Sequence, residues 1–123
     1  MARILIVEDS ADERQALAEL LAAVPHDVRA VPNGRSVLGL LRERPCDLVI
    51  VDMIMPEMDG VETILAVRRK YPDLKIMAMS GGGVAGFDKY LNLSRQLGVQ
   101  QFLPKPFTND EMLRAVQRLL APR

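Results

Sequence analysis

The chain has 123 residues, of which 49% are hydrophobic and 26% are charged, and its 16 lysines and arginines balance its 16 acidic residues. This length and composition predict a single globular domain over residues 1–123, and the balanced charge argues against nucleic acid or an anionic membrane as a direct partner. The single cysteine, Cys46, excludes an internal disulfide, and no apolar run approaches the roughly 20 residues that span a bilayer, so we expect a cytoplasmic protein.

The first predicted strand is an apolar run over residues 3–8 that ends in two adjacent acidic residues, Glu8 and Asp9. Ser10 and Glu13 follow with the spacing of a helix capping box, in which the side chain of each residue bonds the backbone of the other. Apolar residues then recur at helical spacing, so the pattern predicts the first helix directly after the acidic pair.

Pro25 ends this helix, and a weaker apolar pattern over residues 26–31 predicts the second strand. A second helix is expected from about residue 35 to residue 44. His26 and Cys46 fall at the amino ends of strands, away from the acidic residues, and we assign them structural roles.

The third predicted strand, residues 47–51, is an apolar, mostly β-branched run typical of a strand that is buried on both faces. It leads directly into Asp52, which on its own could cap the next turn or act as a reactive carboxylate. Asp59 and Glu62 again have capping-box spacing, which predicts Asp59 as the N-cap of the third helix. Four apolar residues form the expected buried face of this helix: Val61, Ile64, Leu65 and Val67.

A fourth apolar run, residues 74–79, ends in Ser80 and is followed by three glycines that predict a flexible loop over residues 81–83. The fourth helix is expected from about residue 85 to residue 97, with Gly98 as its C-cap. The helical spacing of its apolar residues predicts that one face of this helix is buried.

Residues 99–103 form the last predicted strand, which leads into a Pro-Lys-Pro turn centred on Lys105. Thr108 and Glu111 make another capping box and open the last helix. Strands and helices therefore alternate along the whole chain, which predicts an α/β fold with a parallel sheet and helices on both faces. In such sheets, ligands bind at the carboxyl ends of the strands, where the winding direction changes.

The residues at these carboxyl ends are three carboxylates, one hydroxyl and one ammonium: Glu8, Asp9, Asp52, Ser80 and Lys105. Clustered carboxylates repel one another, and a hard divalent cation relieves the repulsion, so we expect Mg²⁺, for which Mn²⁺ could substitute. The cation, Lys105 and Ser80 around one free carboxylate would cradle a phosphoryl group. The set predicts a carboxylate nucleophile that forms an acyl phosphate.

At these residues the chain resembles the receiver domains of two-component response regulators. Four segments carry the resemblance, in the family's order and over the whole chain: Val7-Glu8-Asp9-Ser10, the VDMIMPEMDG run from Val51 to Gly60, Met79-Ser80-Gly81 and Leu103-Pro104-Lys105-Pro106-Phe107. The resemblance implies a flavodoxin-like fold, a (βα)5 three-layer sandwich whose five-stranded parallel sheet has the order 2-1-3-4-5.

The resemblance also implies a chemistry for the acidic residues. Asp52 would accept a phosphoryl group from a phosphohistidine on a sensor histidine kinase or a histidine phosphotransfer protein. Glu8, Asp9, Asp52 and the backbone carbonyl of Ile54 would hold Mg²⁺. Such a protein is a phosphoacceptor in phosphorelay signalling and not an enzyme that turns over a substrate.

Ser80 and Lys105 would bind the phosphoryl oxygens, and the Lys105–Pro106 bond would be cis. Ser80 and Phe102 would form the switch, in which the rotamer of Phe102 reports phosphorylation to the face made by the fourth helix, fifth strand and fifth helix. That face would control a downstream effector protein, and phosphorylation-dependent homodimerisation through it stays open.

Some positions depart from the family's commonest pattern. Phe102 stands where tyrosine is frequent, so the switch would rest on packing alone. The glycine-rich loop after Ser80 is longer than in a typical receiver, which predicts that it is mobile until a phosphoryl group binds. Ile54 and Gly82 hold two positions that influence the lifetime of the acyl phosphate, and neither has a polar side chain to orient water, so we expect slow self-hydrolysis.

Two other functions compete with this interpretation. A haloacid-dehalogenase-like phosphohydrolase also uses an aspartate nucleophile with Mg²⁺, but it needs a second aspartate two residues later, where this chain has Ile54. A binding module that has lost phosphorylation would not need the complete acidic set together with Ser80 and Lys105. No effector domain follows the last helix, so we expect a stand-alone receiver, although an excised domain of a longer regulator would have the same residues.

Overall fold

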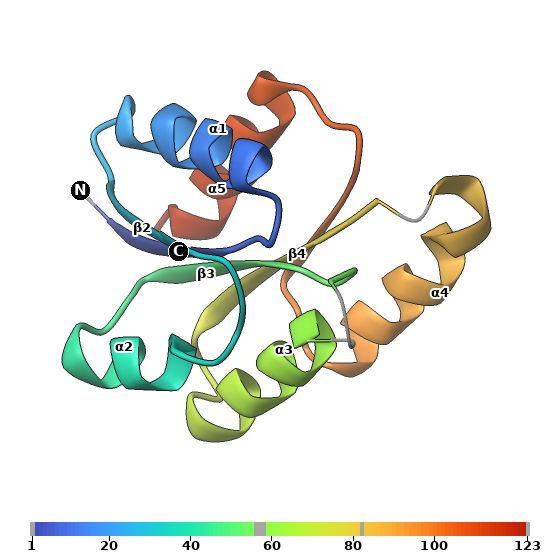
Figure 1. Ribbon diagram of the computed structural model, residues 1–123, viewed down its shortest axis with the longest axis horizontal. Helices are drawn as coiled ribbons and strands as arrows, with labels where there is room; N and C mark the ends of the chain where they lie inside the picture. The colour runs from blue at the N-terminus through green and yellow to red at the C-terminus, as the bar shows by residue number, and fades with distance from the viewer. Residues whose placement is uncertain (1, 56–58, 82, 123) are drawn as a thin grey trace.

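The computed structural model describes residues 2–55, 59–81 and 83–122, in which strands and helices alternate (Figure 1). The strands are β1 (Arg3–Val7), β2 (Asp27–Val31), β3 (Leu48–Asp52), β4 (Lys75–Ser80) and β5 (Gln101–Pro104). The helices are α1 (Ala11–Ala22), α2 (Val37–Glu43), α3 (Asp59–Lys70), α4 (Gly83–Gln96) and α5 (Asn109–Leu120). No helix in the described ranges is long and apolar enough to cross a membrane.

The strands form one parallel sheet in the order β2-β1-β3-β4-β5, which confirms the flavodoxin-like fold and the predicted order 2-1-3-4-5. The chain first adds β2 beside β1 and then crosses to β3 on the other side of β1. Crossovers in parallel sheets are right-handed, so this change of direction places helices on both faces of the sheet. The carboxyl ends of β1 and β3, where the direction changes, are the expected ligand site of such a sheet.

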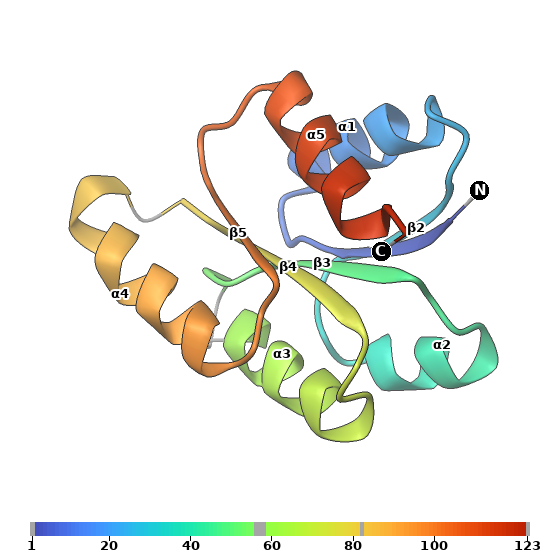
Figure 2. The same ribbon diagram turned by 180° about the vertical axis from the view of Figure 1, so that it is seen from behind.

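The sheet separates two hydrophobic layers, with α1 and α5 on one face and α2, α3 and α4 on the other (Figures 1 and 2). Successive strand residues point to opposite faces, so Ile4 and Ile6 pack in the first layer and Leu5 and Val7 in the second. All the residues of β3 are buried, as its continuous apolar run predicts. The site at the end of β3 therefore rests on a strand that is covered on both faces.

The buried face of α3 differs from the prediction at Leu65. Ile64 and Val67 are buried as expected, but 38% of Leu65 is exposed and Thr63 is buried in its place. At about 100° of rotation per residue, the midpoint of the face defined by Ile64 and Val67 lies about 70° from Thr63 and about 130° from Leu65, so Leu65 turns toward solvent. The apolar character of Leu65 was misleading here, because helical spacing decides which side chains are buried.

The ends of α4 and β5 also shift from the predicted positions. Helix α4 begins two residues earlier than expected, at Gly83, which has a positive φ of 63° and was assigned to the loop. Gly98 follows the helix with φ 71° and donates its N–H to the Arg95 carbonyl at 3.1 Å, which fits the predicted C-cap. Strand β5 begins two residues later than predicted, at Gln101. Gly82 lies outside the described residues.

The predicted capping boxes have different outcomes. At Thr108 the box is complete, since its hydroxyl accepts from the Glu111 N–H and the Glu111 carboxylate accepts from the Thr108 N–H, both at 3.0 Å. At Ser10 the hydroxyl accepts from the Glu13 N–H at 3.4 Å, but the N–H of Ser10 binds a different carboxylate. Asp59 is the first residue of α3 instead of its N-cap, and its side chain lies outside the described part of the chain.

Candidate functional site

Four parallel strands bring the predicted site residues to one edge of the sheet. Asp52 is the last residue of β3, Ser80 is the last residue of β4, and Lys105 directly follows β5. Glu8 and Asp9 directly follow β1, the neighbour of β3. The site is thus assembled from distant parts of the sequence and held in register by the backbone hydrogen bonds of a buried sheet.

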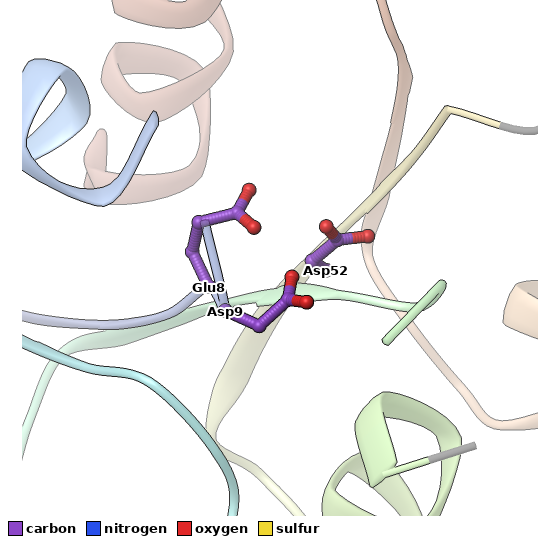
Figure 3. Close-up of side chains that lie close together, drawn as sticks. All are labelled: Glu8, Asp9 and Asp52. Atoms are coloured by element: carbon purple, nitrogen blue, oxygen red, sulfur yellow. The ribbon is translucent and has the colours of Figure 1, made fainter. Parts of the chain in front are cut away.

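Figure 3 shows the carboxyl groups of Glu8, Asp9 and Asp52 gathered at the ends of β1 and β3. One oxygen from each group lies within 4.8 Å of the others. Glu8 and Asp52 are buried, with 0% and 4% of their surfaces exposed, whereas Asp9 faces solvent. Carboxylate oxygens at this spacing, with access to water on one side, suit a hard divalent cation such as Mg²⁺.

Asp52 is held by partners on both of its carboxylate oxygens. Its Oδ1 accepts from the Ile54 N–H at 3.0 Å, and its Oδ2 accepts from the Lys105 ammonium at 3.0 Å. The next residue, Met53, donates its N–H to the Met79 carbonyl at 2.8 Å and so ties the carboxyl end of β3 to β4. These contacts fix the direction in which the carboxylate points.

The first turn of α3 packs directly on the backbone of Asp52. A side chain at Gly60 would place its Cβ only 1.9 Å from the Asp52 carbonyl oxygen, a distance that no real contact allows. Only glycine lets the helix approach this closely. The close packing of α3 at Gly60 therefore helps to fix the position of the Asp52 backbone.

Glu8 is a fully buried carboxylate with two hydrogen-bond donors. Its Oε1 accepts from the Lys105 ammonium at 2.7 Å, and its Oε2 accepts from the Ser10 N–H at 3.1 Å. Burial raises the pKa of Glu8 to about 7, and the nearby charge of Asp52 adds to the rise, while the bonds from Lys105 and Ser10 work against it. A divalent cation would relieve the same cost of burial.

The ammonium of Lys105 is the counter-ion of the acidic cluster. Besides Glu8 and Asp52, it contacts the Glu13 carboxylate of α1 at 3.1 Å. Burial acts to lower the pKa of Lys105, but the hydrogen bonds and charges of Glu8 and Asp52 outweigh it and raise the pKa. Lys105 therefore stays positively charged at neutral pH.

Ser80 is 4% exposed, and its carbonyl accepts from the Lys105 N–H at 2.8 Å. The peptide bond between Lys105 and Pro106 is cis. A hollow beside these residues is lined by Asp9, Asp52 and Lys105 together with part of Ile54, which is 38% exposed. The hollow gives a solvent-borne ligand access to the carboxylate of Asp52.

A family model described as the response regulator receiver domain matches residues 4–117 of the chain. The chain belongs to this family. The receiver domain is therefore part of two-component signalling, in which response regulators interact with kinases and effectors.

Named relatives agree with this assignment. The response regulator receiver protein CpdR of Brucella abortus is 33% identical over 120 residues, which cover 98% of each chain. The response regulator FleR of Pseudomonas aeruginosa is 34% identical over 117 residues, which cover 95% of this chain but 24% of FleR. Among solved structures, the chemotaxis protein CheY4 of Vibrio cholerae has a TM-score of 0.88 at 29% identity, covering 98% of this chain and 99% of its own.

The aromatic residue predicted as a switch lies on β5 and contacts a residue of α4 in the receiver domain. Phe102 is half-buried and packs edge-to-face on Phe87, with 5.8 Å between ring centroids and 79° between ring planes. Phe87 is itself 38% exposed. The two rings line a second hollow with Ser80 and Lys105, so the aromatic pair adjoins the site.

Sequence reasoning missed the part that α1 plays in the receiver domain. Glu13 was assigned only to a helix cap, yet its carboxylate reaches Lys105. The guanidinium of Arg14 donates to the carbonyls of Glu8 and Asp9 at 3.0 and 3.4 Å and so braces the acidic loop. The sequence could have indicated this role through position alone, because Glu13 and Arg14 lie one helical turn beyond the acidic pair.

Proposed function

We propose that this receiver domain accepts a phosphoryl group on Asp52 from a phosphohistidine of a sensor histidine kinase or a histidine phosphotransfer protein. The observation that carries the proposal is the environment of one buried carboxylate. Asp52 has an ammonium on one oxygen, a backbone N–H on the other, and two further carboxylates within cation-binding distance. Each of these features serves a phosphoryl transfer to that carboxylate.

The transfer needs no oxidant or other co-reactant. A carboxylate oxygen of Asp52 forms the new bond to phosphorus while the bond between phosphorus and the donor's imidazole nitrogen breaks. The nitrogen keeps the electron pair of that bond. Lys105 would contact the transferred oxygens as a positive charge, and the Ser80 hydroxyl would donate a hydrogen bond to them.

The donor set fits Mg²⁺, with Mn²⁺ as a substitute of similar ligand preference. Glu8, Asp9 and Asp52 would hold the ion together with the backbone carbonyl of Ile54. When bound, the ion would neutralise negative charge on the transferred oxygens. Its presence would also relieve the repulsion among the three carboxylates.

The output of the domain would be a conformational change and not a released product. Ser80 and Phe102 would couple the phosphoryl group to the face formed by α4, β5 and α5, which would control a downstream effector protein. Homodimerisation of the phosphorylated form through that face is the alternative output. Residues 1–123 would act as a single receiver domain in either case.

Incubation with acetyl phosphate and Mg²⁺, followed by intact mass measurement, tests the proposal. The wild type should gain the mass of one phosphoryl group, and both Asp52→Asn and chelation of the metal should abolish the gain. An equal gain in Asp52→Asn would move the acceptor to another residue. Steady release of phosphate from phosphate esters would favour a phosphohydrolase instead.

A further inference from the structure

Glu13 is a third carboxylate on Lys105, and it differs from the other two in exposure. The side chains of Glu8 and Asp52 are 0% and 6% exposed, while that of Glu13 is 52% exposed. The Lys105 side chain between them is 15% exposed. Glu13 therefore lies on the solvent side of the ammonium.

The backbone of α1 aims this carboxylate at the site. Ser10 caps the helix through the Glu13 N–H, but its own N–H is occupied by Glu8. The Glu13 carboxylate is thus displaced from the capping box and bonds Lys105 instead. Its position follows from the local structure and not from a chance surface contact.

Glu13 also makes the entrance to Asp52 more negative. Three carboxylates but one ammonium line the described part of the hollow, namely Asp9, Glu13, Asp52 and Lys105. A small phosphoryl donor is itself an anion and must pass this entrance. A negative charge beside the path of an anion lowers its local concentration, and it raises that of a cation.

We propose that Glu13 is a specificity-determining residue whose carboxylate, tethered by Lys105, disfavours small dianionic phosphoryl donors and favours the divalent cation. The inference rests on the proposed function, because it concerns the rate at which Asp52 is phosphorylated. In acyl phosphate donors, an Asp52 oxygen forms the bond to phosphorus as the bond from phosphorus to the acyl oxygen breaks, and the carboxylate leaves with the electron pair. Glu13 takes no part in that step and acts only through its charge.

The test compares Glu13→Gln with Asp12→Asn, which removes a neighbouring charge from the same first turn of α1 without altering the lining of the hollow. Adduct formation is followed by intact mass at saturating Mg²⁺ with acetyl phosphate, a dianion at neutral pH, and with phosphoramidate, a net monoanion. We expect Glu13→Gln to react about threefold faster than wild type with acetyl phosphate and to gain less with phosphoramidate. The increase in rate with acetyl phosphate should fade at high ionic strength, and Asp12→Asn should react at the wild-type rate.

Calorimetric titration with Mg²⁺ alone gives a readout that does not depend on phosphorylation. Loss of the Glu13 charge should raise the dissociation constant for Mg²⁺ by about twofold, so the variant binds the cation more weakly while it reacts faster with the dianion. A purely structural role would not move these two quantities in opposite directions. Thermal unfolding of both variants verifies that they fold.

Three outcomes would overturn the inference. Equal rates of adduct formation for Glu13→Gln and wild type would do so. An increase in that rate that is the same for both donors and insensitive to salt would do so as well. An unchanged Mg²⁺ affinity would also contradict it. These results leave the proposed function intact, whereas the absence of an adduct in every protein, wild type included, would refute the proposed function and the inference together.

Discussion

At the scale of single residues, replacing Lys105 by methionine removes the cation that Glu8 and Asp52 share. Two buried carboxylates then face each other without a counter-ion, so the free energy of unfolding should fall by about 3 kcal/mol in metal-free buffer. A divalent cation can take the place of the ammonium. Added Mg²⁺ should therefore raise the melting temperature of Lys105→Met more than that of the wild type, as measured by thermal denaturation.

Lys70→Met is the matched control for this prediction, because Lys70 is an exposed lysine at the far end of α3. It should leave both the stability and the response to Mg²⁺ unchanged. If Mg²⁺ stabilises Lys105→Met no more than it stabilises the wild type, Lys105 is not the counter-ion of the cation site.

Ile54 allows a prediction about the lifetime of the phosphorylated form. Its apolar side chain lines the hollow beside Asp52 and cannot orient an attacking water. Ile54→Asn supplies an amide at the same position and should speed the loss of the phosphoryl group by about tenfold, below the usual contribution of a positioned acid or base. Gly82, the second position expected to influence this lifetime, lies outside the described residues.

Decay of the isolated phosphorylated protein, followed by intact mass, measures this effect. Ile54→Val keeps the position apolar and should decay as slowly as the wild type. Rapid decay of the wild type that Ile54→Asn leaves unchanged would mean that this side chain does not limit hydrolysis.

The sequence was sufficient to predict which residues meet at the site but not all of their contacts. Asp52 is the last residue of its strand, Glu8 and Lys105 each directly follow a strand, and parallel strands deliver such residues to one edge. The contact between Glu13 and Lys105 depends on the direction of a long side chain on α1, which no periodicity specifies. The same holds for the edge-to-face pair of Phe87 and Phe102.

At the scale of secondary-structure elements, the contact between α3 and β3 depends on Gly60. Gly60→Ala would place a Cβ against the Asp52 carbonyl oxygen, so the helix must move. We expect a loss of about 2 kcal/mol in the free energy of unfolding, together with slower phosphoryl uptake because Asp52 shifts. Urea denaturation and the acetyl phosphate reaction measure the two effects.

Gly39 offers the opposite case within the same chain. It lies inside α2, and a Cβ there would meet nothing within 4 Å. Gly39→Ala should therefore raise the free energy of unfolding by up to about 1 kcal/mol through helix propensity alone, without changing phosphoryl uptake. Similar losses in both variants would show that the close approach of α3 is not what requires glycine at Gly60.

The elements were predictable to the extent that burial dictated them. Strands such as β3 are apolar on both faces, and their pattern leaves little choice of position or type. Helix ends and helix faces were less predictable from the sequence. A capping motif can place the start of a helix at more than one residue, and an apolar residue can lie on the buried or on the exposed face. Leu65 is exposed and Asp59 is helical, since the packing of α3 on the sheet fixes its rotation and its start.

At the scale of the whole molecule, Arg68 joins segments at the edge of the sheet opposite the site. Its guanidinium donates to the carbonyls of Pro72, Leu74 and Gly98 at 2.7–2.9 Å and to the Gln100 side chain at 3.0 Å. The fork of Arg68 thus links the loops that enter β4 and β5. The amino-acid pattern gave no sign of this network, because three of the four acceptors named are backbone carbonyls, which every residue type carries.

Arg68→Lys keeps the charge but loses the planar, branched guanidinium, so several of these oxygens lose their hydrogen-bond donor. The free energy of unfolding should fall by about 2 kcal/mol, as measured by urea denaturation. Phosphoryl uptake at Asp52 should keep its wild-type rate under conditions where the variant stays folded, because the site lies at the other edge. A large fall in that rate would show that the two edges are coupled.

The most direct test of the central claim is to locate the phosphoryl group after reaction with acetyl phosphate and Mg²⁺. Borohydride reduces an acyl phosphate of aspartate to homoserine, and tandem mass spectrometry of the digested protein identifies the converted residue. We predict conversion at Asp52 and at no other carboxylate. Conversion at Asp9 or Glu8, or no conversion in a protein that has gained the phosphoryl mass, would contradict the account.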